Sequence, residues 1–218
     1  MQARLAQPCL LCGARSRAGL LCPACAADLP RLPAERCPVC AMPTPGGAVC
    51  GACLKRAPAY DRTEAVFRYA FPADVLVQRL KYGGQTVLAG YLAGLMAPSA
   101  RPDLIVAMPL HPHRLRERGY NQAALLAGHL ARRLALPFAA TACRRLRDTP
   151  PQVDLPVKAR RRNLRGAFDC TMDLAGRHVA LVDDVMTSGA SLDELARVVK
   201  RAGAAEVSAW VVARTVRD

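Results

Sequence analysis

The spacing of the cysteines constrains this chain more than any other feature of its sequence. Eight of the ten cysteines lie within residues 9–53, where they form two copies of the pattern C-x2-C-x9-C-x2-C, offset by 28 residues. Short loops such as "CPAC", "CPVC" and "CGAC" turn the backbone around paired sulfur atoms, as a tetrahedral thiolate site requires. The candidate metal ligands are Cys9, Cys12, Cys22, Cys25, Cys37, Cys40, Cys50 and Cys53.

Structural zinc explains this pattern better than disulfides or a redox pair. Disulfides require an oxidising compartment, and nothing in the sequence indicates export. A thioredoxin-like pair would stand between a strand and a helix, whereas these cysteines stand among Pro and Gly. A segment of about 50 residues with little apolar periodicity buries too little surface to fold alone, so we expect metal to stabilise residues 1–56. Whether each copy holds its own ion or the pairs interleave stays open.

The composition indicates a folded, basic protein. Of the 218 residues, 52% are hydrophobic and 22% are charged, which favours a packed core over disorder. No stretch resembles a signal peptide or a membrane span, so we expect a cytoplasmic protein. The net charge is +14, and residues 101–170 alone hold 14 Lys and Arg against 5 Asp and Glu. This surplus suits a small polyphosphate or nucleic acid, although a GC-rich genome could also produce many arginines.

From about residue 60 the chain alternates between strand-like and helical stretches, which predicts an α/β domain over residues 60–218. The apolar stretches that read as strands are 63–71, 103–110, 178–184 and 206–215. The stretches with helical spacing are 73–83, 87–97, 121–136 and 191–203. Strands this apolar indicate a parallel sheet with helices on both faces, and ligands bind such sheets beyond the carboxyl ends of the strands.

The stretch "VALVDDVMTSGAS", residues 179–191, places two carboxylates at such a strand end. The chain has no GxxxxGK[ST] loop, so the pair is not the magnesium half of a nucleotide hydrolase of that type. Two adjacent acceptors, Asp183 and Asp184, can hold the vicinal hydroxyls of a ribose. The hydroxyls and N–H groups that follow can bind a phosphate, and Gly189 permits close approach. An alternative for Ser191 is a capping box with Glu194, which would explain that serine alone.

The same stretch resembles the phosphoribosyl-pyrophosphate signature of type I phosphoribosyltransferases. Together with "MPLHPHRLRERGYNQAALLA" (108–127), "RDTPPQVDLPVKARRRNLRGAF" (147–168) and the cysteine-rich front, it resembles the ComF family of competence-related, phosphoribosyltransferase-like proteins. Tyr120 stands where we expect Phe. The resemblance implies a type I phosphoribosyltransferase-like sheet preceded by a small zinc module. It also implies that Asp183 and Asp184 bind ribose hydroxyls. The implied 5-phosphate site comprises Thr187, Ser188, Gly189, Ala190 and Ser191.

Two further segments gain an expected role from the resemblance. The turn at 111–118 occupies the place where these enzymes grip pyrophosphate, with His111, Arg114 and Arg118 as candidates; the alternative is a solvated basic turn. Residues 144–165 occupy the place of a mobile hood. Mg²⁺ would accompany phosphoribosyl pyrophosphate as its cofactor.

The remaining histidines and cysteines give weaker signals. We interpret His113, His129 and His178 as structural. Cys143 and Cys170 stand apart from the front cysteines, and we interpret them as small buried hydrophobic side chains.

Two functions from different classes follow. One is a protein that binds phosphoribosyl pyrophosphate or a related ribose 5-phosphate, and that contacts single-stranded DNA and DNA-processing proteins during DNA uptake and transformation. The other is an active phosphoribosyltransferase of nucleotide metabolism with an unidentified acceptor, for which the sequence specifies no catalytic residue. Aromatic residues make up 5% of the chain, without the interleaved pattern of a base-stacking surface.

Overall fold

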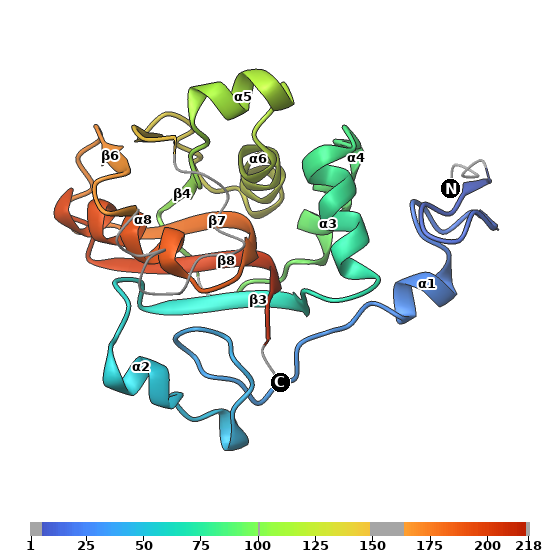
Figure 1. Cartoon of the computed structure of the whole chain (residues 1–218), viewed down its shortest axis with the longest axis horizontal. Coiled ribbons are helices and arrows are strands. Elements are labelled where there is room, and N and C mark those ends of the chain that lie inside the picture. Colours follow the sequence, from blue (N-terminus) through green and yellow to red (C-terminus); the bar gives the residue numbers. More distant parts are fainter. Residues whose placement is uncertain (1–5, 100, 149–163, 217–218) are drawn as a thin grey trace.

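The central sheet is parallel, as predicted. The computed structural model describes residues 6–99, 101–148 and 164–216. The strands of the sheet are β3 (Arg62–Arg68), β4 (Leu104–Ala107), β7 (His178–Met186) and β8 (Glu206–Arg214). Their order is β3-β8-β7-β4, and every neighbouring pair is parallel (Figure 1). All four carboxyl ends therefore lie along one edge.

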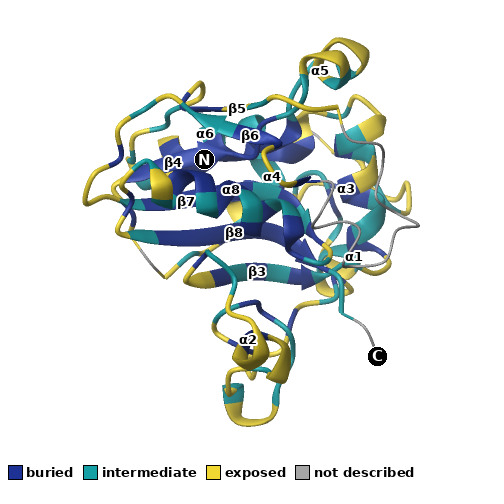
Figure 2. Ribbon diagram, turned by 60° about the vertical axis from the view of Figure 1, so that its left-hand side comes forward, coloured by how far each residue is buried: buried dark blue, intermediate teal, exposed yellow. Residues whose placement is uncertain are grey.

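Helices cover both faces of this sheet. All four predicted helices form. They are α3 (Ala73–Tyr82), α4 (Val87–Leu95), α6 (Gln122–Leu134) and α8 (Ala190–Arg201). The first three pack together on one face, and α8 packs on β7 and β8 from the other (Figure 1). Connections between parallel strands are right-handed in nearly all proteins, and this preference places helices on both faces of such a sheet. β8 is buried along nearly its whole length, which explains its continuous apolar sequence (Figure 2).

Three predictions made from local pattern need correction. The segment expected as a polar turn forms a short helix, α5 (Pro112–Arg118), since Pro112 suits a first helical turn and Gly119 ends the helix at φ 79°. Helix α8 starts earlier than predicted, at Ala190, with Gly189 as its N-cap at φ 74°, so the capping box at Ser191 is wrong.

The third correction concerns the expected hood. Its first residues, expected within 144–165, belong to a strand, β5 (Cys143–Arg145), which pairs antiparallel with β6 (Phe168–Cys170) just beyond its other end. Cys143 and Cys170 are therefore direct cross-strand partners; Cys143 is buried, as expected, whereas Cys170 is half-buried. Burial and the neighbouring Cys170 raise the pKa of the Cys143 thiol. The middle of the hood, 149–163, lies outside the described residues.

The cysteine-rich front folds from short elements, and the segment between its two cysteine clusters runs along β3. The short elements are β1 (Gln7–Pro8), β2 (Arg15–Ser16), α1 (Pro23–Ala27), the 3₁₀ turn η1 (Pro45–Gly47) and α2 (Gly51–Lys55). The N–H of Leu32 donates to Val66 O at 3.0 Å, and the N–H of Arg68 donates to Pro30 O at 2.7 Å. The front of the chain thus covers the exposed edge of the sheet, which protects it from pairing with other chains.

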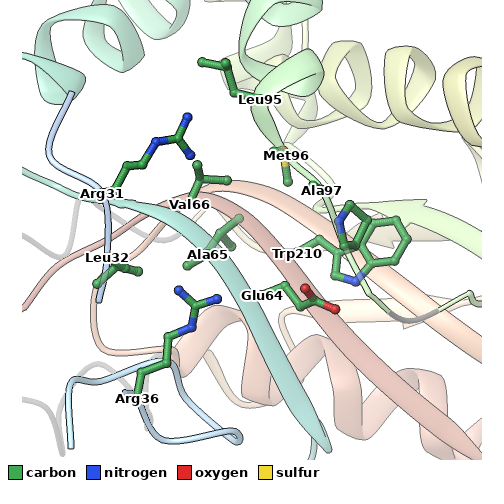
Figure 3. A pocket seen from close by; sticks show the side chains of 12 residues that line it. Arg31, Leu32, Arg36, Glu64, Ala65, Val66, Leu95, Met96, Ala97 and Trp210 are labelled. Carbon is green, nitrogen blue, oxygen red and sulfur yellow. The ribbon is translucent and has the colours of Figure 1, made fainter. Parts of the chain in front are cut away.

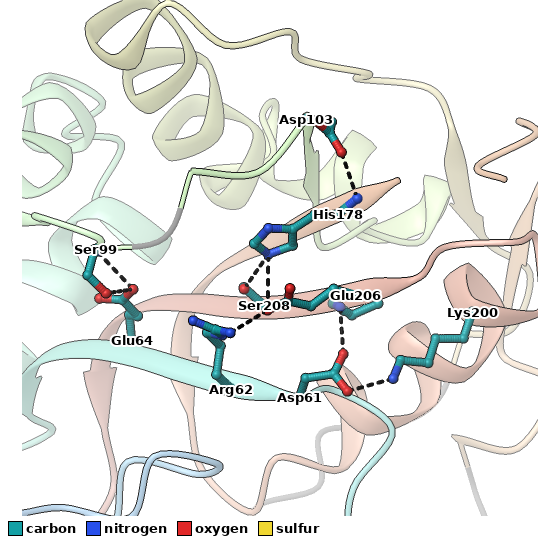
Figure 4. A network of polar contacts seen from close by, with 10 residues as sticks. Asp61, Arg62, Glu64, Ser99, Asp103, His178, Lys200, Glu206 and Ser208 are labelled. Atoms are coloured by element: carbon teal, nitrogen blue, oxygen red, sulfur yellow. Dashed lines mark hydrogen bonds and ion pairs between the residues drawn. The ribbon is translucent and has the colours of Figure 1, made fainter. Parts of the chain in front are cut away.

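A polar network ties the amino ends of three strands together (Figure 4). Asp61 accepts from Lys200 Nζ and from the N–H of Val207, both at 2.7 Å. His178 Nε2 lies 2.7 Å from Ser208 Oγ on β8. This network lies at the opposite edge from the predicted ligand site, so the contacts of His178 fit the structural role expected for it.

No helix in the described ranges is both long and apolar enough to cross a bilayer; the longest, α6, has 13 residues.

At the carboxyl edge, the buried side chain of Arg214 joins the front of the chain to the loop after β7. Its Nε donates to Cys40 O at 2.9 Å, and its Nη1 donates to Met186 O at 3.0 Å. The same Nη1 also donates to Thr187 O and, at 2.8 Å, to Thr215 O. Arg214 is 6% exposed, so these carbonyl groups have little access to water as an alternative partner.

We predict that Arg214→Met lowers the free energy of unfolding by about 3 kcal/mol, because it removes the buried bonds to Cys40 O and Met186 O together with those to Thr187 O and Thr215 O. Arg144→Met is the matched control, since Arg144 pairs with Asp169 on the surface at 2.8 Å and such pairs contribute about 0–1 kcal/mol. Urea unfolding of both variants measures the difference. Equal, small losses in the two variants would contradict the bridging role of Arg214.

Candidate functional site

The two adjacent carboxylates lie within the end of β7 rather than beyond it. The strand continues to Met186, so Asp183 and Asp184 are still paired into the sheet region, with Asp183 opposite Val211 of β8. Asp183 is half-buried, and Asp184 is 2% exposed. The expectation that both carboxylates stand outside the core is therefore wrong for Asp184.

Lys81, at the end of α3, compensates the charge of this pair. Its Nζ lies 3.3 Å from Asp184 Oδ2. Burial lowers the pKa of Lys81, but the two carboxylates outweigh burial and raise it overall, so the ammonium is retained. Asp184 Oδ2 nevertheless has no hydrogen-bond donor of good geometry. Burial and the neighbouring Asp184 raise the pKa of Asp183 to about 8. A second cation beside the pair would relieve this repulsion.

The loop from β7 to α8 consists of three residues that leave the helix amino terminus open. Thr187 is exposed and Ser188 is half-buried, with Ser188 Oγ 3.4 Å from the N–H of Ala190. Gly189 is required at its position because a Cβ there would lie 2.8 Å from the Tyr60 hydroxyl, in a backbone conformation with positive φ. The amino end of the twelve-residue helix α8, with Ser191 in its first turn, favours an anion at this loop.

Basic side chains from α5 line a pocket together with Lys81, the lysine that pairs with Asp184. β4 pairs with β7, so the segment that follows β4 reaches the same edge of the sheet. A pocket of about 330 Å³ lies there, and its lining residues are Lys81, Tyr82, Gly84, Arg114, Glu117, Arg118 and Tyr120. Two of the three pyrophosphate candidates, Arg114 and Arg118, therefore share a pocket with the lysine that pairs with Asp184.

The third candidate, His111, has a different position. Its Nδ1 accepts the N–H of His113 at 3.3 Å and so caps the start of α5. The same Nδ1 lies 3.8 Å from Asp148, which also contacts Arg114 at 3.4 Å. His111 is not among the residues that line the pocket.

Lys81, Tyr82 and Arg145 belong to this region but were missed from the sequence. Burial and the nearby Arg114 lower the pKa of Arg145. Asp148 and Asp183 act in the opposite direction but do not outweigh them. The sequence offers one signal for Lys81: the chain has four lysines, and this one lies in the last turn of α3. Nothing in the local pattern distinguishes Tyr82 or Arg145.

The two cysteine clusters each close on themselves, which settles the pairing left open by the sequence. Within each cluster the four Sγ atoms lie within 4.8 Å of one another. Cys12 and Cys22 Sγ are 3.8 Å apart, and Cys40 and Cys50 Sγ are 3.5 Å apart. Four thiolates at about 2.3 Å from a tetrahedral zinc ion would be separated by about 3.8 Å, so the clusters fit zinc.

Backbone donors in each cluster favour the thiolate form of its first cysteine. Burial opposes ionisation of Cys9 and Cys37. The N–H groups of the loops around them nevertheless lower the thiol pKa values, to about 6 and about 7 respectively. Thiolate is the form that binds metal.

A second pocket, of about 180 Å³, lies between the front of the chain, β3 and the end of α4 (Figure 3). Arg31 and Arg36 line it from the front, and Glu64 from β3. Trp210 Nε1 beneath it has no hydrogen-bond partner, but Trp210 is 0% exposed, so a ligand in the pocket cannot reach that nitrogen. This pocket contains none of the residues predicted from the sequence.

Comparisons with known proteins agree with both parts of this architecture. A family model described as the phosphoribosyl transferase domain matches residues 121–217, and one described as the double zinc ribbon domain matches residues 2–54. The DNA utilization protein YhgH of Escherichia coli strain K12 is 37% identical over 191 residues, covering 83% of this chain and 84% of that protein.

Two relatives carry competence names. Competence protein F of Haemophilus influenzae is 35% identical, covering 76% of this chain and 78% of that protein. Competence protein ComFC of Bacillus subtilis is 27% identical, covering 89% of this chain and 84% of that protein.

We predict two zinc ions per chain, because each cluster supplies four thiolates to a separate site. Cys40→Ser should reduce the content to one ion, whereas the control Cys170→Ser should retain both. Elemental analysis of the purified proteins measures this. A wild-type protein without zinc or another thiophilic metal would contradict the assignment.

We predict opposite effects on stability for the two carboxylates. The pKa of Asp183 is raised from its usual 3.8 to about 8, so its stabilising contribution is complete below pH 3.8 and is lost as pH rises through about 8. Asp183→Asn should therefore be at least as stable as the wild type at pH 9. Asp184→Asn leaves Lys81 without its partner and should be less stable at pH 7. Urea unfolding at both pH values tests this; the reverse order would contradict the charge arrangement.

Proposed function

The chain belongs to the ComF family of competence-related proteins, and we propose on this basis that it binds phosphoribosyl pyrophosphate, or a related ribose 5-phosphate, together with Mg²⁺. We also propose a division into a zinc module, residues 1–56, and a phosphoribosyltransferase-like domain, residues 60–218. The observation that supports the ligand best is the arrangement at the carboxyl edge. There, an acid pair, an open helix amino terminus and a basic pocket lie next to one another.

Each part of this ligand has a matching group. The two vicinal hydroxyls of ribose are donors that suit Asp183 and Asp184 as acceptors. The 5-phosphate suits the loop 187–191, whose hydroxyls and helix terminus favour an anion. The pyrophosphate suits the pocket lined by Lys81, Arg114 and Arg118. In the proposed complex, His111 acts through the placement of α5 rather than by direct contact.

The acid pair also fits a magnesium ion. Among the described residues, Asp184 Oδ2 has no hydrogen-bond partner, and burial together with the neighbouring Asp184 raises the pKa of Asp183 to about 8. Carboxylate oxygens are the ligands that Mg²⁺ prefers, and the ion would supply the positive charge that Lys81 alone does not complete. When bound, Mg²⁺ stabilises charge on a departing pyrophosphate. The chain's own contribution is to orient the ribose and hold the pyrophosphate oxygens.

We further propose that the protein acts in the cytoplasm on single-stranded DNA during DNA uptake or utilisation. The names of its relatives support this role. So does the basic surplus of residues 101–170, which suits a phosphate backbone. Reduced thiolate clusters persist in a reducing compartment, which agrees with the cytoplasm.

Calorimetry with pairs of matched ligands tests the ribose site. Wild-type protein with Mg²⁺ should bind ribose 5-phosphate at least about tenfold more tightly than 2-deoxyribose 5-phosphate, since a hydrogen bond to a charged group contributes about 1.5–3 kcal/mol. Asp183→Asn should reduce this preference. Phosphoribosyl pyrophosphate should bind more tightly than ribose 5-phosphate, and its breakdown to free pyrophosphate would reveal turnover.

The control is Asp173→Asn, which changes an aspartate whose Oδ1 accepts from the nearby N–H of Ala175 at 3.0 Å. Equal affinity for the two sugars, or no binding of any ribose phosphate, would overturn the proposed site.

A further inference from the structure

An exposed tyrosine stands at the mouth of the basic pocket. Tyr82 ends α3, directly after the lysine that pairs with Asp184, and it is 73% exposed. The guanidinium carbon of Arg118 lies 5.2 Å from the centre of the Tyr82 ring, and Lys81 Nζ lies 5.9 Å from it. The ring also lines the basic pocket, so its exposed surface is open to a ligand that enters there.

Tyr82 differs from the other aromatic residues in the described part of the chain. Phe71 is the one other strongly exposed aromatic ring there, at 75%, and no cation is recorded over it. Phe67 and Phe168 do have arginines over their rings, but both are buried. Tyr82 combines exposure with neighbouring cations.

The surroundings of the ring are held in place. Arg118 donates through Nη1 to Gln122 Oε1, and the Tyr120 hydroxyl donates to Leu80 O. Gly84, in the lining of the same pocket, has nothing within 4 Å of the place where a Cβ would stand. The pocket therefore offers open space of about 330 Å³ beside a positioned ring. Pre-positioned groups lose little entropy when a ligand binds.

We propose that this pocket is a nucleobase subsite, in which a base stacks on Tyr82 while Arg114 and Arg118 hold the phosphate attached to it. Every nucleobase has a π-face that stacks on an aromatic side chain, and arginine adds a cation–π contribution. Glu117 in the lining can accept from a base amino group. The proposal deepens the proposed function, on which it rests, by placing a base next to the ribose site through the Lys81–Asp184 pair.

Pyrophosphate alone does not account for this arrangement. Lys81, Arg114 and Arg118 attract an inorganic anion. The tyrosine ring offers it no favourable contact, and Glu117 repels it. The low aromatic content of the chain is no obstacle either. One ring in the right place is sufficient for a single base, and composition does not reveal where that ring lies.

The base could belong to single-stranded DNA or to a free nucleoside. The test compares binding of a thymidine octamer with that of an octamer of abasic residues, by fluorescence anisotropy at two salt concentrations. Phosphate contacts are equal in the two probes, so the ratio of their affinities reports on the base. Competition by thymidine distinguishes the sources. Displacement of the octamer indicates that a free nucleoside can fill the subsite, and lack of displacement indicates that the single strand is required.

Wild-type protein should prefer the thymidine octamer, and Tyr82→Ala should lose roughly 5- to 150-fold in affinity for it while binding the abasic octamer unchanged. Tyr82→Phe should retain the preference, and Tyr82→Leu should not. Phe71→Ala, the matched exposed aromatic, should behave as the wild type. Binding of inorganic pyrophosphate and of ribose 5-phosphate should be unaffected by Tyr82→Ala.

Equal affinity of the wild type for the two octamers would overturn the subsite. So would a Tyr82→Ala variant that keeps the preference, loses pyrophosphate to the same degree, or matches Phe71→Ala. Melting temperatures establish that the variants are folded, as expected for exposed side chains. Because the octamers require no ribose 5-phosphate, a base preference that depends on Tyr82 would stand even if the ribose site failed its own test.

Discussion

The bonds made by the guanidinium group of Arg214 hold the carboxyl edge of the sheet together. One buried side chain reaches the backbone of the second cysteine cluster at Cys40, and the loop after β7 at Met186 and Thr187. The loop that is proposed to bind phosphate therefore starts from carbonyl groups that the zinc module helps to position. Tyr60 adds to this arrangement, because its hydroxyl stands where a side chain at Gly189 would be. The cysteine-rich front and the α/β part of the chain are therefore held together by direct contacts, and not by the connecting segment alone.

The acid pair illustrates how a binding site differs from a stable core. Asp183 and Asp184 are adjacent and largely withdrawn from water, and one lysine does not neutralise both. Burial and the neighbouring Asp184 together raise the pKa of Asp183 to about 8. In the proposed function, this arrangement is where a cation and the two ribose hydroxyl groups bind.

The sequence allowed much of the fold to be predicted because its signals are local. The strands at 178–186 and 206–214 are continuous apolar runs, and α6 and α8 have regular apolar spacing, so these elements were found within a few residues. Local pattern failed where short-range preferences compete. The segment 112–118 is polar and rich in Arg, which reads as a turn, yet Pro112 and Gly119 give it the start and end of a helix. For α8, the serine that reads as a cap lies inside the helix, since a glycine with positive φ starts it earlier.

By itself, the sequence determined the cysteine ligand set, the positions of the main strands along the chain and the acid pair at the end of β7. These depend on spacing and periodicity within about a dozen residues. The tertiary structure alone decided that each cysteine set closes on itself, that Lys81 pairs with Asp184, and that Arg118 lies over Tyr82. It also decided the bond from Arg214 to Cys40, which spans 174 residues of chain. Such contacts depend on which helix faces which strand end, and packing of the whole core sets that; no local pattern encodes it.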